Sequence, residues 1–156
     1  MPTLYVIAGC NGAGKTTLSK KLLPEYLGVK EFVNADEIAR GLSPFNAEGV
    51  AFSAGRITLE RIRELVAEGT DFAIETTLAT RSYASLFKEL KAKGYKIFIL
   101  FVYLHHIDEA IKRVKQKVKH GGHNIPQNII ERRFERGLKN LTNIIFVAGG
   151  QMGHYR

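Results

Sequence analysis

Apolar and polar positions follow two patterns in turn along this chain. Short apolar runs rich in β-branched and aromatic residues are separated by longer segments in which apolar residues return at helical spacing. The short runs predict strands and the longer segments predict helices. The predicted strands are 3–8, 31–35, 71–76 and 95–104. The predicted helices are 15–23, 47–68, 81–93, 107–119 and 126–141, with a shorter one at Glu37–Gly41.

Alternation of strands and helices with short connections is typical of a parallel sheet that is covered by helices on both faces. The chain has 156 residues and no internal repeat or linker, so we expect a single domain over 1–156. In sheets of this kind, ligands bind beyond the carboxyl ends of the strands. The residues that follow each predicted strand are therefore the first candidates for chemistry.

The first predicted strand runs into a phosphate-binding P-loop. Residues 9–16 match the pattern G-x-x-x-x-G-K-[ST] without a mismatch, and a predicted helix follows. Backbone N–H groups of such a loop surround an anion, the lysine contacts the β- and γ-phosphates, and the hydroxyl ligates Mg²⁺. We therefore predict a P-loop nucleotide-binding fold. The expected nucleotide-binding residues in the loop are Gly9, Asn11, Gly12, Ala13, Gly14, Lys15, Thr16 and Thr17.

Carboxylates follow the second and third predicted strands. Asp36 is either a general base that takes a proton from an acceptor hydroxyl or the N-cap of the short helix that begins at Glu37. Glu75 either holds Mg²⁺ through water, binds a sugar hydroxyl, or is a solvated strand end. Thr76 and Thr77 follow it and are expected to contact the substrate.

Basic residues are concentrated in the second half of the chain. Residues 1–78 carry 8 Lys/Arg and 10 Asp/Glu, whereas residues 79–156 carry 15 and 5. The segment 107–137 contains two basic helices joined by the turn Gly121–Pro126, and this predicts a hinged helical lid over phosphates. A nucleic-acid surface is the alternative, but the segment lacks the interleaved aromatic residues expected for base stacking. The lid arginines expected at the phosphates are Arg113, Arg133 and Arg136.

The remaining composition narrows the location and the partners that we expect. The single cysteine, Cys10, excludes an internal disulfide and fits a reducing cytoplasm. The longest apolar stretch, Tyr95–Leu104, is about half the length of a membrane-spanning helix. The N-terminus lacks the layout of a signal peptide. We therefore expect a cytoplasmic protein with neither membrane contact nor nucleic-acid binding.

Four motifs in this order resemble the zeta-toxin family of small P-loop kinases, in its bacterial zeta-like branch. They are the loop Ala8–Thr17, the segment Asn34–Ala39, the segment Glu75–Ala79, and the basic run Ala110–Val114 with Gly121–Pro126 and Arg132–Phe134. The similarity covers about residues 4–141. The P-loop occurs in many families, whereas the four motifs together are much more specific.

The resemblance implies an ATP-dependent kinase that needs Mg²⁺ and phosphorylates a hydroxyl of a small substrate. The founding toxins phosphorylate UDP-N-acetylglucosamine, and some members have a protein antitoxin as partner. By this similarity, Asp36 is the base, Glu75 contacts the acceptor, and Lys15 with the lid arginines holds the transferring phosphate. ATP is favoured over GTP by the resemblance, and no Asn-Lys-x-Asp guanine signature is present.

The C-terminal segment 142–156 departs from the family pattern. The resemblance predicts a last strand after Leu141, and the apolar run Ile144–Ala148 is our candidate for it. The alternative is a segment that takes no part in the fold.

The sequence therefore predicts an α/β three-layer P-loop fold with a parallel sheet of about five strands and a helical lid. The function that we expect is an ATP-dependent kinase with an unidentified small hydroxylated acceptor. The alternative is an ATPase or nucleotide switch that binds a protein or nucleic acid through its basic half.

Overall fold

The computed structural model describes residues 1–148 and 151–155, and the side chains of residues 1–144. Its strands are β1 (Thr3–Gly9), β2 (Glu31–Val33), β3 (Phe72–Thr76), β4 (Lys96–Val102) and β5 (Gln151–Tyr155). Its helices are α1 (Lys15–Tyr26), α2 (Ala35–Leu42), the 3₁₀ turn η1 (Glu48–Val50), α3 (Ala51–Glu68), α4 (Ser82–Ala92), α5 (Ile107–Lys119) and α6 (Gln127–Ala148). Each predicted strand and helix up to residue 141 lies within a few residues of an observed element.

The strands form one parallel sheet in the order β2-β3-β1-β4-β5. This order places the P-loop, which follows the central strand β1, between the ends of β3 and β4. Because Val33 pairs with Ile74, the residues that follow them lie side by side: Asn34, just after β2, and Glu75, near the end of β3. The predicted α/β architecture with a parallel sheet is confirmed.

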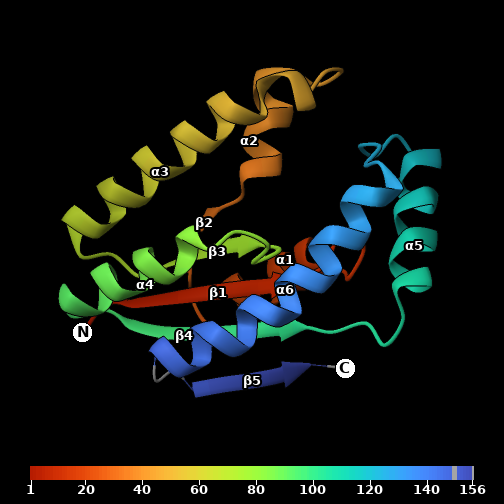
Figure 1. Cartoon of the computed structure of the whole chain (residues 1–156). Helices are drawn as coiled ribbons and strands as arrows, with labels where there is room; N and C mark the ends of the chain where they lie inside the picture. The colour runs from red at the N-terminus through yellow and green to blue at the C-terminus, as the bar shows by residue number, and fades with distance from the viewer. Residues whose placement is uncertain (149–150, 156) are drawn as a thin grey trace.

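Each face of the sheet is covered by its own hydrophobic core. Leu4 and Val6 of β1 point into a core shared with residues of α3, α4 and α6, among them Leu65 and Phe87. Tyr5 and Ile7, which alternate with them, point to the opposite face, where residues of α1 and α5 pack. Alternate residues of β1 are thus buried on both sides, which is typical of a central parallel strand. Figure 1 shows α3, α4 and α6 on one face of the sheet.

Two pairs of helices stand out from the sheet. In Figure 1, α2 and α3 form one arm, and α5 with the first half of α6 forms the other. The two arms meet where His123 Nε2, in the loop between α5 and α6, lies 3.3 Å from Glu48 Oε1 in η1. This contact bridges the space above the P-loop edge of the sheet.

The prediction for the C-terminal segment was wrong in its position. Ile144–Ala148 is the last part of α6 and not a strand, and the fifth strand is formed by Gln151–Tyr155 beside β4. A short apolar run has no periodicity that separates a buried strand from a buried helix end. Here the run continues the apolar stripe of α6, and Leu141 and Ile144 pack into the core beside β1.

The first helix is longer than its sequence indicated. The prediction ended it before Pro24, but α1 continues to Tyr26 with Pro24 inside. The end is then closed by Leu27 and Val29, whose N–H groups donate to the carbonyls of Leu22 and Leu23. One missing N–H near a helix end is tolerated because the downstream residues supply the last hydrogen bonds.

Close packing of α6 on the turn after β3 leads to a stability prediction. A Cβ added to Gly137 would lie 2.5 Å from the Thr77 carbonyl oxygen. We expect Gly137→Ala to lower the free energy of unfolding by about 1–3 kcal/mol, since the helix must move away from the turn. Thermal unfolding measures this as a fall in the melting temperature of several degrees.

Gly55 of α3 supplies the matched control for Gly137. Both glycines lie inside helices, but no atom lies within 4 Å of a Cβ at Gly55. Gly55→Ala should therefore raise stability by about 0.5–1 kcal/mol through helix propensity alone. Equal melting temperatures for the two variants would show that α6 is not seated tightly on this turn.

Candidate functional site

The P-loop has the backbone shape that its glycines predict. Gly9, Gly12 and Gly14 have φ values of 149°, 80° and 91°, a region that favours glycine. A Cβ at Gly9 would collide with the Val102 carbonyl, and one at Gly12 would lie 2.8 Å from the Ala110 carbonyl oxygen. The loop is therefore enclosed by the end of β4 and the first half of α5, and Gly14 starts α1.

Lys15 is buried at the base of this loop, with 7% of its surface exposed. Its Nζ donates a hydrogen bond to the Cys10 carbonyl oxygen at 2.9 Å. Burial lowers the pKa of Lys15, and the negative charge of Glu75 acts in the opposite direction. Because the buried ammonium group of Lys15 is poorly solvated, a phosphate group that binds beside it forms a strong charge-assisted hydrogen bond.

Glu75, at the end of β3, is held by both of its neighbours. The Thr16 hydroxyl lies 2.8 Å from Oε1 and 3.0 Å from Oε2, and Asn34 Nδ2 donates to Oε2 at 3.0 Å. Burial raises the pKa of Glu75, and the charge of Lys15 opposes this rise. The Thr16 hydroxyl and the Glu75 carboxylate are hard oxygen ligands of the type that Mg²⁺ prefers, so this pair fits the ion.

Asp36 lies in the first turn of α2, and it is not the N-cap that one interpretation suggested. The cap is Asn34, whose Oδ1 accepts from the N–H groups of Asp36 at 3.0 Å and Glu37 at 3.4 Å. The Asp36 side chain is thus exposed and has no capping role. Its charge acts on both Lys15 and Glu75, so it lies near the same cluster.

Cations from both helices of the α5–α6 arm approach the site. Arg133 of α6 donates from Nη1 to Asn11 Oδ1 of the P-loop at 3.2 Å. On α5, the Arg113 Cβ would be 3.2 Å from a Cβ at Gly12. Lys117 follows Arg113 by one turn of α5 and therefore lies on the same face of the helix, the one beside Gly12 of the P-loop.

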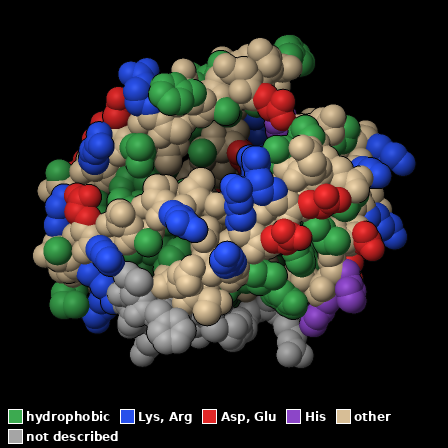
Figure 2. All heavy atoms as spheres, viewed as in Figure 1, with side chains coloured by type: hydrophobic (Ala, Val, Ile, Leu, Met, Phe, Trp, Pro, Cys, Tyr) green, Lys and Arg blue, Asp and Glu red, His purple; other side chains and the backbone are tan. Residues whose placement is uncertain are grey.

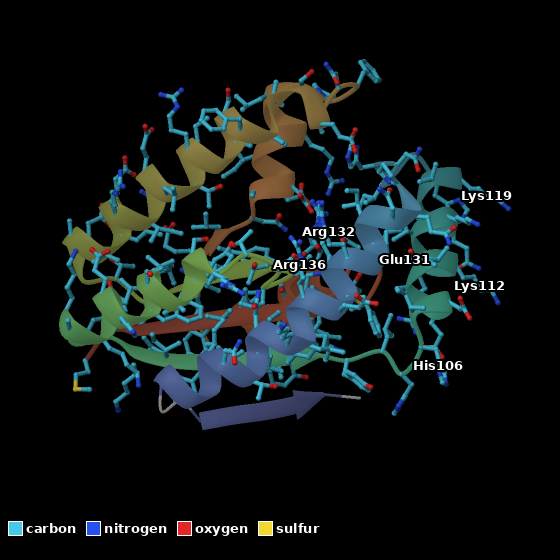
Figure 3. All side chains as sticks on the ribbon, viewed as in Figure 1. His106, Lys112, Lys119, Glu131, Arg132 and Arg136 are labelled. Atoms are coloured by element: carbon cyan, nitrogen blue, oxygen red, sulfur yellow. The ribbon has the colours of Figure 1, made fainter. Side chains whose placement is uncertain are left out.

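Arg136, the third predicted lid arginine, lies on α6 three residues after Arg133. It lines a pocket of about 480 Å³ between α6 and the turn before α4, which also contains Arg81 and Lys139. Figure 3 shows Arg132 and Arg136 on the side of α6 that faces the α2–α3 arm, whereas Lys112 and Lys119 point outward from α5. The structure therefore separates the predicted arginines into Arg113 and Arg133 beside the P-loop and Arg136 beside the turn after β3.

The two threonines after Glu75 serve the turn itself. Thr76 is buried, and its hydroxyl accepts from the Leu78 N–H at 3.0 Å. Leu78 has a positive φ of 56°, which is costly for a leucine, and Asn140 Nδ2 fixes its carbonyl at 2.7 Å. Thr77 is half-buried, and its carbonyl faces Gly137. Glu75 is thus followed by a turn that is fastened to α6.

Sequence reasoning missed several residues of this arrangement. Asn34 was noted only as part of a motif, Lys117 was grouped with the other lysines of its helix, and Asn140 was not considered. Only for Lys117 did a signal exist, since it follows Arg113 by one helical turn. The contacts of Asn34 and Asn140 depend on strand order and helix packing.

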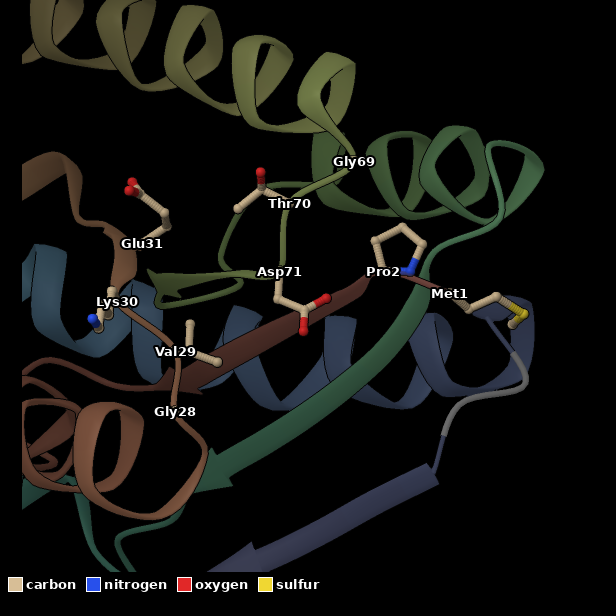
Figure 4. Close-up of a pocket in the computed structure, with 9 residues that line it drawn as sticks. All are labelled: Met1, Pro2, Gly28, Val29, Lys30, Glu31, Gly69, Thr70 and Asp71. Atoms are coloured by element: carbon tan, nitrogen blue, oxygen red, sulfur yellow. The ribbon is translucent and has the colours of Figure 1, made fainter.

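A hollow opens above this cluster. Figure 2 shows it between the α2–α3 arm and the layer of α4 and α6, with Lys and Arg side chains along its rim and an acidic side chain at depth. A pocket of about 640 Å³ lies at the opposite edge of the sheet, around Pro2, Lys30 and Asp71 (Figure 4). That pocket is remote from the P-loop, and the Asp71 carboxylate in it accepts from the Thr3 N–H at 2.7 Å.

The sequence matches the zeta-toxin family over residues 1–146, and the chain belongs to that family. An uncharacterized protein of Haemophilus influenzae strain Rd is 27% identical over 126 residues, covering 81% of this chain and 88% of that protein.

Solved structures share the fold at low sequence identity. A structure from the PezAT chromosomal toxin–antitoxin system of Streptococcus pneumoniae has 19% identity and a TM-score of 0.76, covering 99% of this chain and 68% of that one. The AvrRxo1-ORF1:-ORF2 complex with ATP has 18% identity and a TM-score of 0.76, covering 94% and 50%. Shikimate kinase from Acinetobacter baumannii has 16% identity and a TM-score of 0.58, covering 100% and 84%. The fold is that of P-loop kinases.

Within the described part of the chain, no helix is both long and apolar enough to cross a membrane.

Proposed function

We propose that this protein is an ATP-dependent kinase that transfers the γ-phosphate of ATP to a hydroxyl of a small molecule. The observation that carries the proposal is the cluster of Lys15, Thr16, Glu75 and Asp36. The P-loop lysine and threonine recognise phosphate. The Glu75 carboxylate of β3 contacts Thr16, and the charges of Glu75 and of Asp36, in the first turn of α2, both act on Lys15. A nucleotide-binding switch needs only Lys15 and Thr16, whereas an enzyme that phosphorylates an acceptor also uses the two carboxylates.

Each residue of the cluster has a role in the proposed reaction, and Glu75 has two. Phosphoryl transfer depends mainly on alignment and on stabilisation of negative charge. Lys15 holds the β- and γ-phosphates, and Arg113 and Arg133 supply charge to the transferring group from the α5–α6 arm. Asp36 accepts the proton of the acceptor hydroxyl, and Glu75 orients that hydroxyl. When bound, Mg²⁺ supplies further neutralisation of the phosphates, and Thr16 with Glu75 would hold it.

The acceptor is best sought among small hydroxylated metabolites. Family membership makes nucleotide sugars, with UDP-N-acetylglucosamine first, the class to test. The hollow above Asp36 and Glu75 is open to solvent, and its rim carries Lys and Arg side chains. An acceptor with a hydroxyl at one end and negative charge elsewhere suits this surface.

The proposal is tested by a metabolite screen with ATP labelled in the γ-phosphate. The wild-type protein should transfer label to one compound or a few closely related ones, and a Lys15→Met variant should transfer none. ATP consumption without labelled product across the panel would favour an ATPase or switch.

The alternative function is a nucleotide switch that engages a macromolecule through its basic half. The outward lysines of α5 support it (Figure 3), as does the origin of one structural neighbour in a toxin–antitoxin system. A protein antitoxin is accordingly the partner that we propose to test first. Electrophoretic mobility shift with RNA and DNA at physiological salt tests nucleic acid, since phosphate contacts that survive this salt indicate real affinity.

Arg133 offers a test of the α5–α6 arm in the proposed reaction. We expect Arg133→Ala to lower kcat about 10- to 100-fold with a much smaller rise in the KM for ATP, because an arginine contact to the transferring group matures in the transition state. Lys112→Ala on α5 removes the same charge from a side chain that points outward (Figure 3), and it is the control. Equal losses in the two variants would assign the effect to overall charge.

A further inference from the structure

Asn34 stands where the α2–α3 arm meets the sheet. It is the last residue before α2, its backbone is extended, and only 5% of its surface is exposed. Because Val33 pairs with Ile74 at the end of β2, Asn34 comes out of the sheet beside Glu75. The register of two strands thus fixes this contact.

The Asn34 amide uses both of its ends. Its oxygen accepts from the N–H groups of Asp36 at 3.0 Å and Glu37 at 3.4 Å, and its nitrogen donates to Glu75 Oε2 at 3.0 Å. The direction of the amide follows from its partners, because backbone N–H groups can only donate, so the oxygen faces them and the nitrogen faces Glu75. One buried side chain therefore connects the turn that carries Asp36 with the carboxylate of Glu75.

A helix cap alone does not require asparagine. Ser, Thr and Asp cap helices about as well, and Asp adds a favourable interaction with the helix dipole. Of these residue types, Asp would place a second carboxylate against Glu75, and Ser or Thr would be too short to bridge both partners. The presence of Glu75 makes the amide the suitable choice.

We propose that Asn34 is a positioning residue of the phosphoryl-transfer site, which holds the Glu75 carboxylate and the first turn of α2, with Asp36, in one fixed arrangement. The inference rests on the proposed function, because it assigns Asp36 and Glu75 to the acceptor. Through Glu75 the same link reaches Thr16 of the P-loop. Asn34 thus ties the acceptor side of the site to the nucleotide side without itself contacting the reacting atoms.

The first test measures the ionisation of Glu75 by NMR of ¹³C-labelled glutamate carboxyls across a pH series. Asn34→Asp keeps a cap but replaces the donor with a negative charge, so the pKa of Glu75 should move upward. Asn34→Ser keeps an uncharged cap and loses the donor, so the shift should have the same sign and be smaller. This second variant remains informative if the first folds poorly.

Asn46 supplies the matched control. Its side-chain oxygen also accepts from a backbone N–H, that of Gly49 at 3.2 Å, on the same arm but in an exposed turn. Asn46→Asp makes the same change of charge and should leave the titration of Glu75 as in the wild type. An unchanged Glu75 titration in both Asn34 variants would overturn the positioning role.

The second test separates positioning from general stability. With the acceptor found in the metabolite screen, Asn34→Ser should lower kcat about 10- to 100-fold, the range expected for a misplaced reactive group, while the KM for ATP stays within about twofold. Asn34→Asp alone should also lower the melting temperature, because it places two carboxylates in contact. Adding Glu75→Gln should restore it, since the glutamine amide then donates to the new carboxylate. The control is to add Glu75→Gln to Asn46→Asp. An equal rise in melting temperature in this control pair would contradict a direct link between Asn34 and Glu75.

The two proposals fail in different ways. If no acceptor is phosphorylated but the Glu75 titration responds to Asn34 as described, the proposed kinase activity is wrong and the link between Asn34 and Glu75 holds. If an acceptor is phosphorylated and kcat is the same in Asn34→Ser and wild type, the kinase stands and the positioning role is wrong.

Discussion

Replacing Lys15 with methionine is expected to weaken Mg·ATP binding by roughly 2–3 kcal/mol, about 30- to 160-fold, without destabilising the fold. The lysine is buried and its charged form is disfavoured by that burial. Methionine has nearly the same length and no charge, so it fills the same space at no desolvation cost. The Cys10 carbonyl that loses the lysine keeps the N–H of Ala13 as a donor at 3.2 Å.

Titration calorimetry and thermal unfolding measure the two halves of this prediction. Lys20→Met provides the control, because Lys20 lies on the exposed side of the same helix and its replacement removes the same charge. We expect the control to bind Mg·ATP within about twofold of the wild type. Equal ATP affinity in Lys15→Met and wild type would show that the P-loop is not the nucleotide-binding site.

Much of the fold was predictable because its signals are local. The apolar run of β1, the glycines of the P-loop and the helical spacing of α1 each predict their element without reference to the rest of the chain. The parallel sheet then follows from the alternation of elements. The end of the chain was mispredicted because Ile144–Ala148 suits either a strand or a helix. The apolar side of α6 against the sheet decided that choice, and this contact is not local.

The sequence was enough to identify most residues of the site but not the contacts between them. Glu75 and Asp36 were identified because polar residues at the ends of buried strands are conspicuous. Which strand ends are adjacent depends on the order β2-β3-β1-β4-β5. That order places Asn34 beside Glu75 and gives Asn34 the cap that one interpretation assigned to Asp36. Asn140 and Leu78 escaped notice for the same reason, since their contact joins residues that are 62 positions apart.

The largest effect on turnover is expected from Asp36→Asn. Asparagine keeps the size of the side chain and its capacity for hydrogen bonds but removes its basicity. If Asp36 takes the proton of the acceptor hydroxyl, kcat should fall about 10²- to 10⁴-fold. ATP affinity should stay near that of the wild type, because the P-loop contacts do not involve Asp36. The fold should also be unaffected, since Asn34 and not Asp36 caps α2.

Glu37→Gln is the control that isolates the position of Asp36. Glu37 is the next residue on the same helical turn, and its exposed pair with Arg40 at 2.8 Å contributes little to stability. The change therefore removes one carboxylate from the turn and leaves Asp36 in place, so turnover should stay near that of the wild type.

Glu75→Gln should differ from both variants, because it should raise the apparent constant for the acceptor or for Mg²⁺. Full turnover in Asp36→Asn with the correct acceptor would show that Asp36 is not a general base. Catalysis would then rest on positioning and charge alone, which is possible for phosphoryl transfer.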